Sequence, residues 1–477
     1  MKAPLDAVVI GSGPNGLSAA VELARNGASV LVLEASETIG GGTRTADLTL
    51  PGFHHDVCSS AHPLGILSPY FATLPLAEHG LRWLQSAASV AHPLDGQPPV
   101  MLGPSLRATA EGLGRDAAAY RRLVSPLLRH PHELLTEVLG PAHLPRHPFV
   151  LARFGVPALL PAATLGRALF RGERARALLA GCAAHAALPL SRPVSAAAGI
   201  LFLVAAHVET WPVAQGGSAA ITTALAGHLQ SLGGRIETGK RVRSLADLPP
   251  ARVLLFDTSP AQVAEIAAPM LPGRYVDQLH RFRYGPGVFK VDWALDGPIP
   301  WRDAACREAS TVHLGGTLDD IAASEAAVWR GEHPDRPYLI VVQPTLVDPS
   351  RAPAGKHTAW AYCHVPSGSS VDRTDVIERQ MERFAPGFRD RILGTHVMGT
   401  ADLERYNPNN IGGAITGGVT DLGQLFTRPA VRVNPYATPN PRVLICSAST
   451  PPGGGVHGMC GYHAARTALR HLPAIAV

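Results

Sequence analysis

Lysine is scarce in this chain of 477 residues: of its 42 basic residues only four are lysines, Lys2, Lys240, Lys290 and Lys356. The basic residues are scattered singly, and no run of five or more Lys or Arg occurs. The net charge of +5 therefore does not gather into the concentrated basic surface that nucleic-acid-binding proteins need. We expect no nucleic-acid partner.

Cysteine is also sparse, and its spacing is irregular. The six cysteines form no C-x-x-C pair and no repeating pattern: Cys58, Cys182, Cys306, Cys363, Cys446 and Cys460. This excludes a disulfide framework and the usual zinc-binding motifs, so we expect no metal site and a reducing compartment.

A long hydrophobic run is missing as well. The longest uncharged apolar stretch, Pro193 to Val208, is shorter than the ~18 to 20 residues that a membrane span needs, so we interpret it as a buried helix. The first predicted strand begins at Leu5, which leaves no room for a cleavable signal peptide and predicts a cytoplasmic protein. Peripheral contact with a membrane surface and the oligomeric state stay open.

What the chain does have is enough apolar sequence for two cores: 46% of its residues are hydrophobic and 17% are charged. Residues 5 to 34 predict one βαβ unit, with a strand over Asp6 to Ile10, a helix from about Asn15 to Asn26 and a strand over Ser29 to Glu34. Both strands are nearly continuous apolar runs, which is typical of parallel strands covered on both faces. The fold class is therefore α/β, with a doubly wound Rossmann-like domain.

The rest of the chain alternates between this domain and two insertions. From about Leu74 the sequence is rich in Leu, Ala, Arg and Pro and predicts short helices, whereas the later insertion contains strand-like runs. Segments that resume the first domain are a helix after Gln215-Gly216-Gly217-Ser218, strands over Arg235 to Thr238, Arg241 to Leu245, Arg252 to Phe256 and Arg442 to Ser447, and a helix from about Gly458 to Leu472. We predict a discontinuous dinucleotide-binding domain over residues 1–73, 211–270 and 431–477, and an α+β substrate or cap domain over residues 74–210 and 271–430.

A glycine turn follows the first strand. In Gly11-Ser12-Gly13-Pro14-Asn15-Gly16 the first glycine permits the tight turn, the second lets a pyrophosphate approach the backbone, and the third lets helix and strand pack closely. The helix N-terminus presents free N–H groups to the phosphates. Glu34, followed by Ala35, ends the second strand, where a carboxylate accepts hydrogen bonds from the adenosine ribose.

The segment Ile39-Gly40-Gly41-Gly42-Thr43-Arg44-Thr45 indicates which dinucleotide is bound. Here the sequence resembles the flavoprotein group that includes amine oxidases, protoporphyrinogen oxidases and phytoene desaturases. The resemblance implies that Gly41, Gly42, Thr43 and Arg44 continue the site along the pyrophosphate, and it favours FAD over NAD. An arginine suits this position as a fixed cation beside phosphate.

Three further segments resemble the phytoene-desaturase-like branch of that group: Trp211 to Gly217, Gly233-Gly234 with Val242, and Thr450 to Met459. The resemblance implies that Val242 lies beside the adenine and that Gly458 and Met459 begin a helix whose N–H groups stabilise negative charge on the reduced flavin. One departure is Cys446-Ser447-Ala448, where the family often has Gly-Asp or Gly-Glu. We place Ser447 at this position of the cofactor site.

Two residues are candidates for catalysis. Lys290 lies in the strand-like run Gly287 to Trp293, and in flavin amine oxidases a similar strand carries a lysine that holds a water near flavin N5. The alternative is an ordinary strand-edge lysine in a salt bridge. His62 lies where this fold group brings the chain back towards the isoalloxazine ring, and its alternative is a hydrogen-bonded histidine of the core.

These features together predict an FAD-dependent dehydrogenase, desaturase or oxidase whose substrate donates a hydride to flavin N5. The apolar cap predicts a largely hydrophobic substrate, and oxygen or a quinone would accept the electrons. Alternatives are a flavin amine oxidase, a redox-neutral isomerase that needs reduced FAD, and a non-catalytic binding protein of the same fold. Whether the flavin is covalently attached is open.

Overall fold

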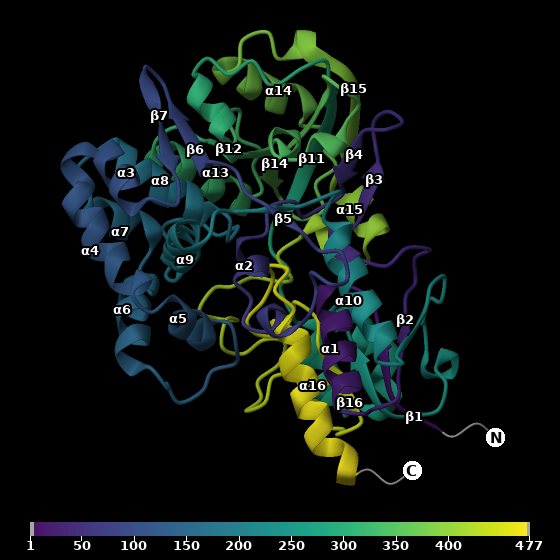
Figure 1. The fold of residues 1–477 in the computed structure, drawn as a ribbon. Coiled ribbons are helices and arrows are strands. Elements are labelled where there is room, and N and C mark those ends of the chain that lie inside the picture. Colours follow the sequence, from purple (N-terminus) through teal and green to yellow (C-terminus); the bar gives the residue numbers. More distant parts are fainter. Residues whose placement is uncertain (1–3, 475–477) are drawn as a thin grey trace.

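The computed structural model describes residues 4–474 and contains two large sheets, one in each half of the molecule (Figure 1). The lower half of Figure 1 is built on a five-stranded sheet in the order β16-β10-β1-β2-β9. All four pairings are parallel. The strands are β1 (Leu5–Ile10), β2 (Val30–Leu33), β9 (Arg235–Glu237), β10 (Ala251–Phe256) and β16 (Val443–Ile445). This is the doubly wound α/β fold that the sequence predicts.

Side chains of β1 alternate between two hydrophobic cores, which explains why the strand is apolar throughout. Ala7 and Val9 pack under helices α1 (Pro14–Arg25), α10 (Ala219–Ser231) and α16 (Met459–His471). Val8 and Ile10 pack on the opposite face under α11 (Pro260–Ala267) and α12 (Gly273–His280). Both faces of a parallel sheet are therefore covered.

The upper half of the molecule contains a seven-stranded, mostly antiparallel sheet in the order β15-β11-β14-β13-β12-β6-β7 (Figure 1). Its strands are β6 (Ala88–Leu94), β7 (Gln97–Leu102), β11 (Gly287–Leu295), β12 (Ala309–Leu314), β13 (Leu339–Val342), β14 (His357–Val365) and β15 (Ile392–Met398). Two small antiparallel pairs join β3 (Thr45–Asp47) to β4 (His54–Asp56) and β5 (Trp83–Leu84) to β8 (Val213–Ala214).

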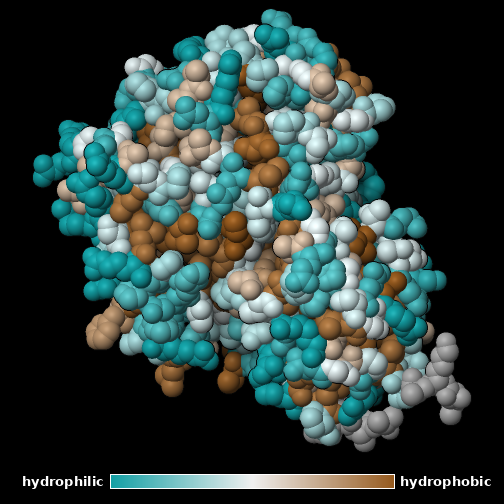
Figure 2. All heavy atoms as spheres, viewed as in Figure 1, coloured by the Kyte–Doolittle hydropathy of each residue, from teal (hydrophilic) through white to brown (hydrophobic). Residues whose placement is uncertain are grey.

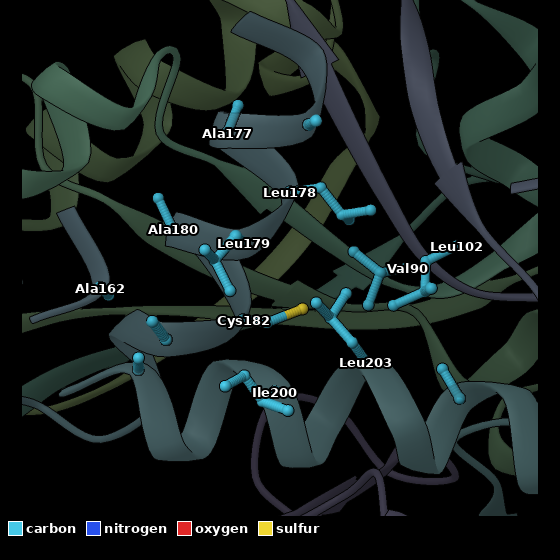
Figure 3. Packing of buried hydrophobic residues seen from close by; sticks show 14 of the residues in the cluster. Val90, Leu102, Ala162, Ala177, Leu178, Leu179, Ala180, Cys182, Ile200 and Leu203 are labelled. Carbon is cyan, nitrogen blue, oxygen red and sulfur yellow. The ribbon is translucent and has the colours of Figure 1, made fainter. Parts of the chain in front are cut away.

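The remaining α-helices lie mostly in the upper half and at its edge. They are α2 (Pro63–Ile66), α3 (Leu106–Gly112), α4 (Ala117–Leu128), α5 (Pro131–Val138), α6 (Pro148–Ala158), α7 (Ala162–Leu169), α8 (Glu173–Ala184), α9 (Ser195–Val208), α13 (Leu318–Trp329), α14 (Thr374–Phe384) and α15 (Thr400–Tyr406). Helices α8 and α9 pack against each other, and Figure 3 shows Leu179 and Cys182 of α8 facing Ile200 and Leu203 of α9. The apolar stretch at 193–208 is thus a core helix, as predicted.

Two predictions of local structure are wrong. The chain between 83 and 102 is not helical but forms β5, β6 and β7, and β6 pairs in parallel with β12 from the second insertion. The strand predicted over Arg241 to Leu245 is absent, because this segment leaves the sheet after β9 and crosses the end of the parallel sheet as a loop. The first error arises because the strand partner of Ala88–Leu94 lies far away in the sequence.

Several large apolar side chains of the helical edge are exposed. They are Leu144, Phe149, Val156, Leu159, Leu160 and Leu169, together with Leu422, Phe426, Val431 and Val433 from a second loop. Figure 2 shows isolated hydrophobic side chains projecting from the lower left edge of this face. Between residues 4 and 474 no single helix is long and apolar enough to cross a membrane, although α6 and α7, which meet at 98°, pass that test as a bent pair.

Candidate functional site

One cavity connects the carboxyl ends of the parallel strands to the upper sheet. Its volume is about 360 Å³, within the usual range of ligand pockets. Gly11, Glu34 and Asp257 line it at the ends of β1, β2 and β10. Ligands of open α/β folds bind at this edge of the sheet.

The glycine turn after β1 packs tightly against Asp257. Gly11 adopts a φ of +104°, and a Cβ on Gly16 would lie 2.2 Å from the carbonyl oxygen of Gly11. A Cβ on Gly13 would lie 2.7 Å from Oδ2 of Asp257. A side chain at Gly13 would therefore strike the protein itself as well as a pyrophosphate.

Asp257 is a buried carboxyl group that the sequence analysis did not select. Its Oδ2 accepts a hydrogen bond from the backbone N–H of Gly16 at 2.9 Å. Burial raises the pKa of Asp257 well above its usual value, and the nearby carboxylate of Glu34 raises it further, while the Gly16 hydrogen bond acts in the opposite direction. Its position at the end of the strand next to β1 is the signal that could have identified it.

Glu34 already has four donors within the protein. Oε2 accepts from the backbone N–H of Ser12 at 3.0 Å and from its hydroxyl at 2.5 Å, and Oε1 accepts from Ser36 N–H at 2.9 Å and from Arg44 at 3.0 Å. A carboxylate has about four acceptor positions, so a ribose hydroxyl must replace one of these donors. The Ser12 hydroxyl can rotate away, and it is therefore the donor most readily replaced.

Arg44 lines the cavity but directs its guanidinium towards protein groups. Besides Glu34, it donates to the Thr38 carbonyl oxygen at 3.0 Å and lies over the ring of Tyr406 at 5.3 Å. Tyr406 in turn donates to the Gly41 carbonyl oxygen at 2.8 Å. The predicted contact of Arg44 with the pyrophosphate stays a prediction, and the contacts present hold the Gly41–Thr43 turn beside Glu34.

The rest of the predicted cofactor residues fall into two groups. Ser12, Pro14, Asn15, Ala35, Gly42, Thr43, Val242 and Ser447 line the cavity together with Gly11, Gly13, Glu34, Gly41 and Arg44. Gly16, Gly458 and Met459 lie behind its wall. The backbone N–H of Met459 donates to Nδ1 of His457 at 3.1 Å, so this N–H is occupied in the structure.

The wall of the cavity fits a dinucleotide. A Cβ on Gly42 would meet no atom within 4 Å, so the cavity is open at this point. Asn15 Oδ1 and Thr258 Oγ1 are buried without a hydrogen-bond partner, and both residues line the cavity. These two atoms are available to the ribose and phosphate groups of a dinucleotide.

Beyond the strand ends the cavity continues into a space that we call the chamber. Its walls come from α8, α9, the segment before β8 and the seven-stranded sheet, and consist of His185, Phe202, Trp211, Thr311, Ile340, Val342, Trp360 and Tyr362. Trp360 and Tyr362 lie side by side on β14 with planes 9° apart. Sequence reasoning assigned none of these residues to a substrate site, because they come from segments that lie far apart in the sequence.

Comparison with known proteins agrees with this architecture. Residues 9–72 match a family model described as an NAD(P)-binding Rossmann-like domain. The chain is 28% identical to rat pyridine nucleotide-disulfide oxidoreductase domain-containing protein 2, over 99% of this chain and 94% of that protein. It is 26% identical to the phytoene dehydrogenase of Streptomyces griseus, over 87% of this chain and 82% of that protein. A solved structure of a putrescine oxidase triple mutant has the same fold, with a TM-score of 0.65 at 16% identity over 98% of this chain and 99% of that chain.

This chain is an FAD-dependent oxidoreductase, similar in sequence to a phytoene dehydrogenase and in fold to an amine oxidase. The predicted fold class, cofactor and enzyme class are thereby confirmed. FAD, when bound, supplies a hydride acceptor at N5, and the protein orients the substrate and excludes water. The individual residues assigned to the cofactor stay predictions.

Lys290 of the flavoenzyme lies in the interior of the upper sheet, on β11 between β14 and β15. Its buried ammonium pairs with Asp292, donates to the Asp56 carbonyl oxygen at 3.2 Å and lies 5.2 Å from the ring centroid of Trp360. Lys290 does not line the cavity, although Trp360 does. It is therefore not a strand-edge lysine, and its role in holding a water near N5 stays a prediction.

The carboxylate that pairs with Lys290 has one lysine and two histidines as neighbours. Burial alone would raise the pKa of Asp292, but Lys290, His396 and His55 together hold it below its usual value. His55 Nδ1 lies 3.5 Å from Oδ1 of Asp292. The arrangement indicates a charge pair that stabilises the packing of β4 against β11.

His62 of the flavoenzyme is buried at the start of α2. Its Nε2 hydrogen-bonds the hydroxyl of Ser218 at 2.8 Å, and burial lowers the pKa of His62 to about 4. Ala61 and Pro63 line the cavity, whereas His62 does not. The structure thus places this ring behind the wall, and its catalytic role stays a prediction.

Proposed function

We propose that this flavoenzyme dehydrogenates an uncharged, largely apolar substrate, with transfer of a hydride from a substrate C–H bond to flavin N5. Loss of a proton from the neighbouring atom completes a new double bond. Oxygen or a quinone then takes up the two electrons. The similarity to a phytoene dehydrogenase over most of both chains supports this reaction type.

The observation that carries the proposal is the composition of the chamber. Six of the eight residues that line the chamber are aromatic or aliphatic besides His185, among them Phe202, Trp211 and Ile340, and these side chains exclude water. Among the described residues that line the whole cavity, the carboxylates belong to Glu34 and Asp257, and both lie at the dinucleotide end. An ammonium group in the chamber would have no anionic partner there and would lose its hydration.

The experiment is anaerobic reduction of the purified, FAD-loaded protein, followed by the flavin absorbance. A panel contains an isoprenoid polyene, an uncharged alicyclic alcohol, a cyclic ketone with an adjacent CH₂–CH₂ unit, and cyclohexylamine. We expect bleaching by at least one uncharged compound and none by the amine. Readmission of oxygen, or addition of a soluble quinone, then identifies the acceptor.

Two outcomes would contradict the proposal. Bleaching by the amine alone would assign the protein to the amine oxidases despite the composition of the chamber. Conversion of a substrate into an isomer, only after chemical reduction of the flavin and without net oxidation, would indicate a redox-neutral isomerase.

A further inference from the structure

His185 is the histidine that lines the cavity, and its environment determines which nitrogen carries the proton. It lies in the chamber at the end of α8, partly exposed, with its ring edge-on to Phe202 at 5.0 Å and to Trp211 at 5.4 Å. Its Nε2 lies 2.9 Å from Nε2 of His313, which comes from β12 behind the chamber wall. One ring must donate this hydrogen bond and the other must accept it.

His92 lies next to His313, and the space behind the His185–His313 pair is tightly packed. His92 Nε2 lies 2.8 Å from the carbonyl oxygen of Gly316, so Nε2 of His92 carries the proton and Nδ1 is bare. The Nδ1 atoms of His92 and His313 both face Gly181 of α8. A Cβ on Gly181 would lie 2.7 Å from Nδ1 of His313 and 3.0 Å from Nδ1 of His92.

The same geometry fixes the proton of His313. Its Nδ1 is buried and has no hydrogen-bond partner. A proton on Nδ1 would be a buried N–H donor without an acceptor, which folded proteins almost always avoid. The proton of His313 therefore belongs on Nε2, and His313 donates to Nε2 of His185.

His185 then carries its own proton on Nδ1. With Nε2 occupied, Nδ1–H is the polar group with which this ring can serve a ligand. Burial and, to a smaller extent, the nearby His364 lower the pKa of His185 to about 3, and burial also holds the pKa of His313 far below its usual value. The ring stays neutral at physiological pH and acts as a donor without being a cation.

Other polar atoms of the chamber are also hydrogen-bond donors without a partner in the protein. Trp211 Nε1 and Trp360 Nε1 are N–H donors that are buried without a partner, and the hydroxyl of Thr311 is buried without a partner as well. The two indole nitrogens can only donate. The polar groups of the chamber thus offer hydrogen-bond donors, set among apolar walls.

We propose that His185 binds the substrate by donating its Nδ1–H to an acceptor atom, so that the substrate is an uncharged apolar molecule carrying a carbonyl, hydroxyl or ether oxygen or an uncharged nitrogen. This rests on the proposed function, because it takes the chamber as the substrate site, and it narrows the substrate class. A pure hydrocarbon would leave these donors unsatisfied. An ammonium ion, which can only donate, would face the N–H donors of His185, Trp211 and Trp360 and no carboxylate.

The test measures binding of three probes of matched shape to the FAD-loaded protein: acetophenone, ethylbenzene and the ammonium form of 1-phenylethylamine. Perturbation of the flavin absorbance gives each dissociation constant. We expect wild-type protein to bind acetophenone about threefold to tenfold more tightly than ethylbenzene, as one additional neutral hydrogen bond requires. The ammonium compound should bind more weakly than acetophenone.

Variants assign this preference to one residue. His185→Phe should keep its affinity for ethylbenzene and lose the preference, since phenylalanine retains the aromatic packing without the donor. His185→Gln, whose amide still donates, should retain part of it. His79→Phe, a matched change at a histidine that packs on His228 away from the cavity, should leave the preference unchanged.

Wild-type affinities that are equal for acetophenone and ethylbenzene, or a preference that persists in His185→Phe, would overturn the assignment while leaving the chamber as a substrate site. If none of the three probes perturbs the flavin, the chamber is not the substrate site, and the proposed function fails with it. The wild-type protein offers a second measurement that needs no stable variant. In ¹⁵N-histidine-labelled protein, Nδ1 of His185 should carry the proton, and protonation of Nε2 instead would refute the inference.

Discussion

At the scale of single residues, Asp257 is a carboxyl group whose protonation depends on folding. Burial raises its pKa well above 3.8, so the folded protein binds a proton that the unfolded chain has already lost above about pH 4. Since the unfolded state binds fewer protons in this window, the free energy of unfolding falls as the pH rises towards the raised pKa. The slope has an upper limit of about 1.4 kcal/mol per pH unit for one group.

Asp257→Asn should remove this slope. Asparagine cannot titrate, yet its amide oxygen can still accept the Gly16 N–H, so the variant should fold. Thermal unfolding of wild-type and variant apoprotein between pH 5 and 8 measures the difference, which should grow in favour of the variant as the pH rises. Parallel curves would show that Asp257 is already ionised at pH 5.

Lys290 permits a prediction that separates a structural from a chemical role. Lys290→Met removes the partner of the buried Asp292 and should destabilise the protein by about 3 to 5 kcal/mol, as is usual when one charge of a buried pair remains. The double variant Lys290→Met/Asp292→Asn should recover much of this loss. Denaturant unfolding measures both.

The rates of flavin reduction and reoxidation in the double variant then test whether Lys290 takes part in catalysis. If Lys290 holds a water beside N5, its loss should slow flavin reduction or flavin reoxidation by about 10²- to 10⁴-fold, even in a variant whose stability is restored. Since the ammonium lies behind Trp360 in the structure, we expect both rates to stay within about tenfold of wild type.

At the scale of elements, helix α8 depends on having no side chain at Gly181. Gly181→Ala would place a methyl group against the rings of His92 and His313, and overpacking of this kind typically costs about 1 to 3 kcal/mol. Gly155→Ala in α6 is the matched control, because a Cβ there meets no atom within 4 Å. The control should stabilise the protein by up to about 1 kcal/mol through helix propensity. If Gly181→Ala and Gly155→Ala change the melting temperature equally, the rings of His92 and His313 move aside without loss of stability.

The elements also show what local sequence can predict. Strands β1, β2, β10 and β16 are short apolar runs bounded by turn residues, and their places in the sheet follow from the βαβ connection. Strands β6 and β7 were missed because Ala88–Leu94 pairs with β12, more than two hundred residues away. Its strand conformation depends on that pairing and on burial, and neither is visible in the local pattern.

The candidate site also has one part that local sequence predicts and one part that it does not. Residues of the dinucleotide half sit in a contiguous motif, Gly11 to Gly16 with Glu34, so their spacing alone identified them. Asp257 is a single acidic residue after a strand, and the residues of the chamber are ordinary core types contributed by six separate segments. Nothing in their local sequence distinguishes them from packing residues, and only the tertiary structure brings them to one wall.

At the scale of the whole molecule, the cofactor domain needs the C-terminal segment for completion. Helix α16 packs so closely on α1 that a Cβ on Gly461 would lie 1.8 Å from the carbonyl oxygen of Asn15, inside the glycine turn. Removal of residues 457–477 should therefore abolish FAD binding, while the core of the upper half, which uses no residue beyond Trp360 on its helical face, should stay folded.

Flavin content after addition of FAD and limited proteolysis measure these two effects. The matched control is Arg470→Ala, a change on the same helix at a side chain that donates a hydrogen bond to Thr467 of that helix. FAD retained by the truncated chain would show that α16 is dispensable for the cofactor site.

The parallel sheet has a consequence for the order in which the protein is made. Its strand β1 is synthesised long before β16, and they lie in one sheet separated only by β10. At translation rates of about 5 to 20 residues per second, the first βαβ unit waits roughly 20 to 80 s for its last strand and helix. During this interval the face of α1 that α16 will cover is open to chaperones. Flavin loading should therefore follow synthesis of α16, and a chain that terminates before α16 lacks the helix that completes its cofactor site.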